Sequence, residues 1–307
     1  MRNNDKEVLY GILNERNIRE VQFGCDKRFP TWYGSTVYFS SNTRQISYKE
    51  TERGSPKRTP LDQYWLDTLY ICEYCFKYTD TEHDLSKHTM YCAFKNKAPG
   101  RIKYLGREYV IRRIKGSKHQ LFCQCLCLFT KLFLDNKSMY FKVDHYEFYI
   151  VCKVGSTKPM GFFSKDLLSY NRNNLACVLI FPPYQRKQLG TLLIEFSYKL
   201  SMAEGLVSGP ESPLSPFGLI SYIRFWSRRI CWELIDGELS DLSLVTLNDI
   251  SEVTGFRIND IITTLKYLDC ISPSGGLLLS TMKDKVTSMH GKISDNMIQV
   301  DELLIEP

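Results

Sequence analysis

The sequence predicts a mixed α/β protein built around one strand, one turn and one helix. Three observations favour this class. Residues 175–181 form an unbroken apolar run, which is typical of a central strand covered on both faces, and Pro182 and Pro183 end it. Leu192, Phe196 and Leu200 then recur at helical spacing. Further strand-like and helix-like segments lie on both sides of this unit, so we expect a central mixed sheet with flanking helices.

Composition limits the protein class. The chain has 307 residues, of which 43% are hydrophobic, which is enough for one large domain or two fused ones. The net charge of +6 indicates a mildly basic surface but does not by itself predict nucleic-acid binding. Eleven cysteines without a secretion-signal pattern at the start favour a reducing compartment with free or metal-bound thiols. No uncharged apolar run approaches the ~20 residues that span a bilayer, so we expect a soluble protein without a membrane partner.

The first hundred residues predict a small β-rich region. Aromatic and β-branched residues between positions 21 and 39 predict strands around a turn at Gly34–Ser35. Residues 40–60 are rich in Ser, Thr, Gly and Pro and predict a loop.

Four residues between positions 72 and 92 have the spacing of a zinc finger. Cys72 and Cys75 are spaced Cys-x2-Cys on a predicted hairpin, and His88 and Cys92 lie one helical turn apart. Four such ligands close a tetrahedron around Zn²⁺ with no open position, which indicates a structural site. His83 lies off that helical face, so we expect it to be solvated. The finger helix offers few base-reading side chains, and we interpret it as a folding clip rather than a DNA reader.

A basic stretch follows the finger and leaves two interpretations open. Its cations are interleaved with aromatic and aliphatic residues, and it is either a contact for nucleosomal DNA or a solvated strand face around a turn at Gly116. The cations are Lys95, Lys97, Arg101, Lys103, Arg107, Arg112, Arg113, Lys115 and Lys118.

The three cysteines at positions 123, 125 and 127 do not predict a metal site. Cys125, Leu128 and Leu132 lie on one face of an amphipathic helix, so the thiols behave as small core residues. Residues 139–143, 146–154 and 160–164 then predict strands.

The turn between the central strand and its helix is a candidate anion site. It holds two cations and a glycine where backbone amides begin a helix, and such a turn can bind a diphosphate. The dinucleotide fingerprint and the Walker loop are both absent, which favours coenzyme A over a nucleotide. An ordinary strand-to-helix connection is the alternative. The turn consists of Gln185, Arg186, Lys187, Gln188, Leu189, Gly190 and Thr191.

Several long segments resemble the MYST histone acetyltransferases. The densest are ACVLIFPPYQRKQLGTLLIEFSYKLS and GPESPLSPFGLISYIRFW, and the similarity runs from NIREVQFGCDKRFPTWY near Asn17 to about Ile271. It implies an acetyl-CoA N-acyltransferase-like core in which the finger is part of the fold. Within the family, the chain most resembles members that act in chromatin silencing.

The resemblance implies roles for two residues in acetyl transfer. Glu211 matches the general base, which removes the proton of a lysine amine whose free pKa is ~10.4. Taken alone, an acidic residue between Pro210 and Pro213 is an ordinary loop residue. Cys177 matches the active-site cysteine, although the strand around it also fits a small core residue. We expect direct attack of the amine on the thioester, with a covalent acetyl-cysteine as the alternative.

Other positions follow by the same resemblance. Val178, Leu179 and Ile180 would offer backbone groups to the pantetheine arm, the turn 185–191 would hold the pyrophosphate, and Ser215 would offer a hydroxyl. Lys137 matches a lysine that the family acetylates on itself. One departure is that Gln188 stands where the family has a glycine; if this position needs a positive φ, glutamine is strained and crowds the diphosphate.

The last third predicts helices. Residues 217–235 predict a long helix, and residues 245–268 predict two short helices around a turn at Gly255 with Thr246 as N-cap, in the shape of a helix-turn-helix. The second short helix carries little positive charge, which favours packing over DNA reading. The expected divisions are an extension (1–16), an N-terminal region (17–122) with the finger at 69–95, a catalytic core (123–228), a helical lobe (229–280) and a weakly structured tail (281–307).

Together these observations predict a nuclear, acetyl-CoA-dependent histone acetyltransferase with a structural zinc ion. The resemblance implies a histone H-four tail as substrate, a role in silencing or transcription regulation, and a multisubunit complex on nucleosomes as the working form. The alternative is an inactive chromatin-binding scaffold of the same fold, in which Gln188 has disabled cofactor binding.

Overall fold

A computed structural model describes residues 12–13, 16–35, 37–39, 66–134, 141–290 and 297–305. The chain forms two compact units. The first comprises residues 1–100, 114–146 and 155–159, and the second comprises residues 101–113, 147–154 and 160–307. The predicted loop at 40–60 and Lys137 lie outside the described residues.

The first unit is built on a four-stranded sheet of order β3-β2-β5-β6. Strand β2 (Ile18–Phe23) runs parallel to β5 (Leu66–Ile71) and antiparallel to β3 (Lys27–Pro30), and β6 (Tyr78–Thr79) follows β5 in a hairpin. The expected turn at Gly34–Ser35 is wrong: these two residues form β4, which pairs with β1 (Ile12–Leu13). The chain turns instead at Gly24, whose φ of +66° suits a residue without a side chain.

Helix α3 (Gln120–Lys131) confirms the prediction of an amphipathic helix with core thiols. Cys123 and Cys127 are buried, and burial raises the pKa of the Cys123 thiol. Phe129 stacks on Phe23 with ring centroids 5.3 Å apart, so the helix is packed against β2 through aromatic side chains.

The second unit contains a five-stranded sheet of order β11-β10-β9-β8-β7. Its strands are β7 (Arg101–Leu105), β8 (Tyr109–Lys115), β9 (Tyr146–Lys153), β10 (Pro159–Asp166) and β11 (Cys177–Ile180). The strands expected near 146 and 160 are confirmed, whereas the described part of the one expected at 139–143 is not a strand. The run at 175–181 was expected to be central, and this is wrong because β11 lies at the end of the sheet.

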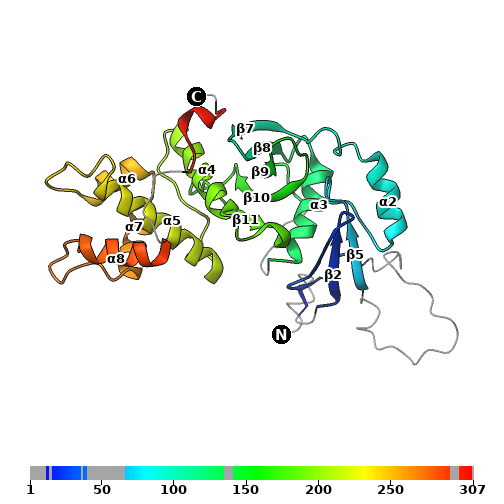
Figure 1. Cartoon of the computed structure of the whole chain (residues 1–307), viewed down its shortest axis with the longest axis horizontal. Coiled ribbons are helices and arrows are strands. Elements are labelled where there is room, and N and C mark those ends of the chain that lie inside the picture. The colour runs from blue at the N-terminus through cyan, green and yellow to red at the C-terminus, as the bar shows by residue number, and fades with distance from the viewer. Residues whose placement is uncertain are drawn as a thin grey trace. The chain divides into compact units, whose positions relative to one another are not determined.

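Helix α4 (Leu189–Ala203) covers one face of this sheet, so the predicted strand–turn–helix unit is confirmed (Figure 1). Leu192, Leu193 and Phe196 are buried against Tyr149 and Phe163 of the sheet. Val178 and Ile180 of β11 pack on the same cluster, which fixes the start of the helix beside the strand.

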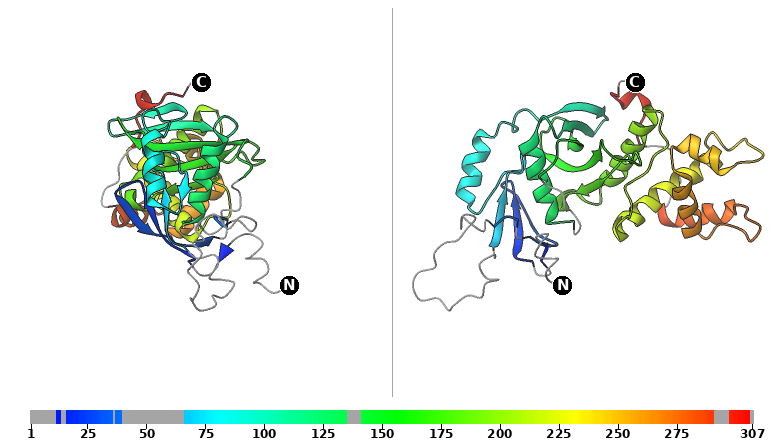
Figure 2. Two further views of the ribbon diagram at one scale, coloured as in Figure 1. Left: turned by 90° about the vertical axis from the view of Figure 1, so that its right-hand side faces the viewer. Right: turned by 180° about the vertical axis from the view of Figure 1, so that it is seen from behind.

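Four helices follow the sheet: α5 (Pro216–Ile235), α6 (Leu247–Thr254), α7 (Ile258–Tyr267) and α8 (Leu279–His290). They share one core, so the helical lobe extends on both sides of the range 229–280 expected for it. The predicted helix-turn-helix is confirmed as α6 and α7: Thr246 forms a capping box at the start, and Gly255 ends α6 with φ +72°. Figure 2 shows α8 alongside α5, where Met282 and Val286 are buried in the lobe core around Trp226.

The tail from residue 281 was expected to be weakly structured, and its described part shows otherwise. Its first residues belong to α8. Residues 297–305 pack against the core formed by the five-stranded sheet and α4, with Ile298 buried. The buried Glu195 carboxylate accepts the Met297 and Ile298 amides at 3.0 and 2.9 Å. Leu303 forms a β-bridge with Tyr104, so this segment, red in Figure 1, lies beside α4 and β7. Sequence periodicity missed these contacts because they join distant positions.

Among the helices that the structure describes, no helix combines the length and the apolar character needed to cross a bilayer.

Candidate zinc site and acetyl-transfer site

Two short elements of the first unit bring the predicted metal ligands together. Cys72 and Cys75 lie in the β5–β6 hairpin, and His88 belongs to α2 (Glu82–Tyr91), which Cys92 ends. Helix α2 begins at Thr81, whose hydroxyl accepts the Asp84 amide at 3.3 Å. His83 is exposed and contacts Asp84 instead, as the sequence predicted.

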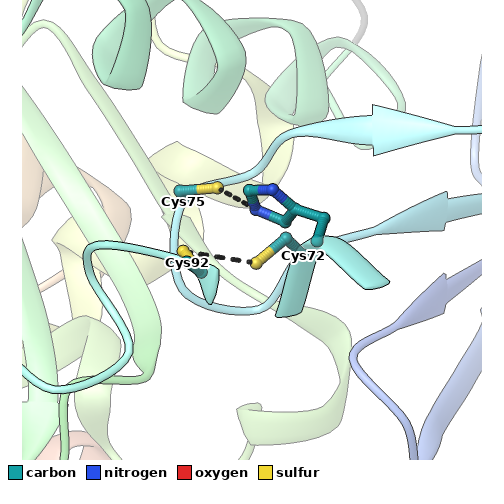
Figure 3. Close-up of side chains that lie close together, drawn as sticks. Cys72, Cys75 and Cys92 are labelled. Atoms are coloured by element: carbon teal, nitrogen blue, oxygen red, sulfur yellow. Dashed lines mark hydrogen bonds between the residues drawn. The ribbon is translucent and has the colours of Figure 1, made fainter. Parts of the chain in front are cut away.

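The four ligand atoms fit a tetrahedral zinc ion. They all lie within 4.8 Å of one another, and Figure 3 shows the sulfur atoms of Cys72, Cys75 and Cys92 around a common space. With Zn–S bonds of ~2.3 Å, two sulfur ligands of a tetrahedron lie ~3.8 Å apart. The Sγ atoms of Cys72 and Cys92 are 3.9 Å apart, and Cys75 Sγ lies 3.2 Å from His88 Nε2. The hydrogen bond between Cys72 and Cys75 lowers the pKa of the Cys72 thiol and raises that of Cys75, so the pair loses its first proton readily. Zinc binding displaces the thiol protons that remain.

In the second unit, β11 offers backbone groups on its outer edge. Antiparallel partners alternate between hydrogen-bonded and non-bonded pairs. The Phe181 amide donates to the Met160 carbonyl at 3.0 Å, so Leu179 directs its backbone groups toward β10. Val178 and Ile180 therefore direct theirs to the opposite edge. The Gln185 side chain donates to the Ile180 carbonyl at 3.0 Å, which ties the following turn to this edge.

The turn at residues 185–191 leads directly into α4. Arg186 and Gln188 both adopt left-handed backbone conformations, with φ of +62° and +58°. The condition stated for Gln188 therefore holds: a non-glycine residue occupies a position with a positive φ, at a cost of ~1 kcal/mol. The side chains of Arg186, Lys187 and Gln188 are exposed, so they extend into the solvent rather than into the core.

The start of α4 supplies amide donors for an anion. The first amides of a helix have no intrahelical acceptor, and Gln188, the N-cap residue, makes no side-chain cap hydrogen bond. A Cβ atom at Gly190 would meet only Ile180 Cγ1, at 3.9 Å, among the described residues. Protein packing therefore does not require the glycine, and the space beside it is open to a ligand.

A cavity of about 360 Å³ lies beside this turn. Its cationic lining residues are Arg107, Lys153 and Lys187, with Glu108 as the acidic one. Several cations around one cavity favour an anionic ligand. This arrangement supports a phosphate-bearing cofactor at the turn.

Glu211 lies on an extended segment next to the start of β11. Its amide donates to the Leu175 carbonyl at 2.8 Å, and Pro210 forms a parallel bridge with Leu175. The Glu211 side chain is exposed, whereas its backbone is hydrogen-bonded to Leu175, which lies two positions before Cys177 in the chain. The structure thus brings the predicted base and the predicted cysteine strand together through main-chain contacts.

Cys177 is half-buried at the start of β11, so the interpretation as a fully buried core residue does not hold. Its cross-strand partner is Ser164 on β10. Because cross-strand partners project to the same face of a sheet, Cys177 and Ser164 share one side of β11 and β10.

Ser215 is the N-cap of α5, and its hydroxyl accepts the Gly218 amide at 3.1 Å. Accepting this bond leaves its own proton able to donate. The residue is exposed, so the cap role and a contact with a cofactor oxygen are compatible.

Comparisons with known proteins decide the family. The model of the MOZ/SAS family matches residues 97–304, which is more than half of the chain. The chain belongs to the MOZ/SAS family. It is 60% identical over 303 residues to histone acetyltransferase SAS2 of Saccharomyces cerevisiae, covering 97% of this chain and 89% of that protein.

More distant relatives match about three quarters of the chain. Histone acetyltransferase MOF of Drosophila melanogaster is 40% identical over 225 residues, which cover 73% of this chain and 27% of that protein. Histone acetyltransferase of the MYST family 1 of Arabidopsis thaliana is 36% identical over 226 residues, which cover 73% of this chain and 50% of that protein. The MYST resemblance stated from the sequence is confirmed, and this MOZ/SAS chain spans half or less of these two relatives.

Sequence reasoning missed one charged residue next to the predicted base. Arg257 precedes α7, and its guanidinium donates to the Asn173 side chain and to the Asn171 carbonyl at 2.8 Å each. No motif marks this arginine, because its partners lie more than 80 positions earlier in the chain.

Proposed function

We propose that this protein is an acetyl-CoA-dependent histone acetyltransferase in which Glu211 acts as general base. The observation that carries the proposal is the arrangement within the second unit of this MOZ/SAS chain. One strand edge, one helix start and one glutamate segment meet around residues 175–191 and 211. This arrangement can hold a long thioester cofactor at one end and remove a proton at the other.

The cofactor lies along β11 and the turn. The edge amides of Val178 and Ile180 donate to the pantetheine arm, as an added strand would. The amides at the start of α4 and the cations Arg186 and Lys187 hold the pyrophosphate. Gly190 allows the diphosphate to approach the helix closely, and Ser215 donates to a cofactor oxygen.

Glu211 makes the lysine amine nucleophilic. It takes a proton from the substrate ammonium, the neutral nitrogen attacks the thioester carbonyl, and the C–S bond breaks. The attacking nitrogen then loses its second proton to the leaving thiolate, and Glu211 releases the first proton to solvent, so atoms and charge balance. Cys177 lines the site near the thioester. The alternative order, with the acetyl group first carried by the Cys177 sulfur, uses the same base.

The zinc-binding group has a structural role in this scheme. Cys72, Cys75, His88 and Cys92 would fill all four positions around the ion, which leaves none for substrate. The metal would hold the hairpin to α2 and supply no chemistry to acetyl transfer.

The substrate and setting follow from the family. The named relatives are histone acetyltransferases, and we extend this activity to a histone tail, with the H-four tail as first choice, on nucleosomes in the nucleus. A multisubunit complex is the expected working form. The basic strands β7 and β8 offer a surface for nucleosomal DNA.

A variant at Glu211 tests the base. Glu211→Gln keeps the shape of the side chain and removes the base, so we expect acetylation of a histone tail peptide near neutral pH to fall by ~10²–10⁴-fold. Binding of acetyl-CoA, measured by isothermal titration, should stay within a few-fold. Glu252→Gln, on the exposed side of α6, is the matched control. Full activity in Glu211→Gln would refute the assignment.

One observation favours a second function, that of a chromatin-binding scaffold without activity. Gln188 occupies a left-handed position in the turn and its side chain is exposed, so it can compete with a diphosphate for the space beside the α4 amides. Isothermal titration of the unmodified chain separates the two functions: absence of acetyl-CoA binding supports the scaffold, and saturable binding supports the enzyme.

A further inference from the structure

The segment that carries Glu211 is hydrogen-bonded on both sides. On one side, the Asn174 amide donates to the Gly209 carbonyl at 3.0 Å and the Glu211 amide donates to the Leu175 carbonyl at 2.8 Å. On the other side, the Ser208 amide donates to the Gly255 carbonyl at 3.0 Å. Residues 208–211 therefore act as a short strand between the segment that leads into β11 and the turn that joins α6 to α7.

Arg257 links these three segments through its side chain. Its guanidinium reaches the Pro210 carbonyl at 3.5 Å, in addition to the Asn171 carbonyl and Asn173 Oδ1. A guanidinium is planar and offers five donors in a fixed fork, so it can hold acceptors from different segments in one arrangement. Pro210 immediately precedes Glu211, so the fork acts next to the proposed base.

The first turn of α7 also fits closely against Gly209. A Cβ atom at Gly209 would lie 2.5 Å from Asp260 Oδ2 and 3.3 Å from Arg257 Cδ. The first distance is shorter than carbon and oxygen can tolerate without displacement. Asp260 is partly buried, and desolvation raises its pKa to about 6 while the nearby charge of Arg257 acts in the opposite direction.

We propose that Arg257 is a positioning residue for acetyl transfer, which fixes Pro210 and thereby the orientation of the Glu211 carboxylate. The inference rests on the proposed role of Glu211 as base. It also gives the helix-turn-helix a use other than reading DNA: the turn between α6 and α7 holds the segment of the catalytic glutamate. The Glu211 side chain is exposed, and the backbone hydrogen bonds of residues 208–211 fix the point from which it extends.

Removing the Arg257 guanidinium should lower the rate of the chemical step and leave the affinity for acetyl-CoA unchanged. In Arg257→Ala, we expect kcat for a histone tail peptide to fall by ~10–100-fold, because small displacements of a catalytic group have effects of that size. The Kd for acetyl-CoA should change less than about twofold, since Arg257 lies outside the turn. Lys266→Ala, which removes an exposed cation from the same helix, is the control and should match the unmodified protein.

A chemical rescue and one further variant separate positioning from folding. Millimolar guanidinium ion should restore part of the activity of Arg257→Ala by occupying the vacated place, and it should restore none in Glu211→Gln. Gly209→Ala inserts a methyl group between Asp260 and Arg257, and it should lower kcat with little change in the Kd for acetyl-CoA. A merely structural arginine would instead show reduced thermal stability with no rescue.

Hydrogen–deuterium exchange gives a local measurement. In Arg257→Ala, the peptide that covers residues 208–214 should exchange faster, while α4 and β11 keep their protection. Unchanged exchange together with unchanged kcat would overturn the inference.

The outcomes distinguish this inference from the function on which it rests. If Glu211→Gln is inactive and Arg257→Ala is fully active, the positioning role fails and the base assignment stands. If Glu211→Gln is active, the proposed base itself fails, whatever Arg257→Ala does.

Discussion

The zinc-binding group and the acetyl-transfer site are assembled in opposite ways. The four metal ligands lie within one hairpin and the helix that follows it, so local structure brings them together. The proposed acetyl-transfer site needs β11, the start of α4, the segment at 208–211 and the turn before α7, which distant parts of the chain supply. A local site depends on its own ligands, whereas a composite site depends on backbone contacts that position each part.

The largest expected effect is the loss of stability that follows removal of a metal ligand. Structural zinc contributes an apparent ~10–16 kcal/mol to small domains, which matches or exceeds the ~5–15 kcal/mol stability of a typical domain. Cys72→Ser should therefore leave the finger hairpin and α2 unfolded. The measurements are zinc content, far-UV circular dichroism and thermal unfolding, with and without a strong chelator.

Cys25→Ser provides the matched control, because Cys25 is an exposed thiol of the same unit outside the cluster. It should keep one bound zinc and the unmodified melting temperature. A Cys72→Ser protein with the unmodified melting temperature would show that the cluster is not a metal site on which the fold depends.

The next largest effect concerns Gly190, which we expect to matter for the ligand and not for the fold. A methyl group there meets open space in the protein and replaces a poor helix former, so stability should stay level or rise by up to ~1 kcal/mol. The same methyl group would stand between the α4 amides and the diphosphate, so acetyl-CoA should bind at least ~10-fold more weakly, the loss of ~1.4 kcal/mol.

Calorimetric titration and thermal unfolding of Gly190→Ala measure the two quantities separately. Gly276→Ala, in the loop before α8, adds the same group where Ser272 Oγ is the nearest atom, at 3.4 Å, and should leave acetyl-CoA affinity unchanged. Equal affinity in Gly190→Ala would place the diphosphate elsewhere.

The two sites also differ in how far the sequence predicts them. Ligand spacing identified Cys72, Cys75, His88 and Cys92, because a hairpin and a helix turn have fixed geometry. An apolar run predicted the strand near Cys177 correctly. It could not show that the strand lies at the end of the sheet, because an apolar run indicates that the faces of a strand are covered and not how many strands pair with it.

Long-range contacts explain the remaining errors. Nothing local distinguishes the C-terminal segment around Ile298 from a loose tail, because its anchor, Glu195, lies about a hundred positions earlier. Arg257 was missed for the same reason. The turn at residues 185–191 was predicted from its own residues, whereas the roles of Glu211 and Cys177 were predicted only through family resemblance, which carries information about residues that are distant in sequence.

The smallest expected effect separates charge from backbone conformation in the turn. Gln188 and Arg186 share nearly the same φ, +58° and +62°, so glycine relieves the same strain at either position. Part of that gain is offset by the greater freedom of glycine in the unfolded chain, so stability should change by less than ~1 kcal/mol in both variants.

The affinity for acetyl-CoA should change in opposite directions in the two variants. Gln188→Gly removes a neutral, exposed side chain from the turn and should tighten acetyl-CoA binding about two- to fivefold, a gain below ~1 kcal/mol. Arg186→Gly removes a cation next to the diphosphate and should weaken binding, and less so at high salt because screening already reduces that contact. Titrations of both variants at low and high ionic strength make the comparison. Tighter binding in both would mean that the turn is limited by its backbone and that Arg186 does not contact the phosphates.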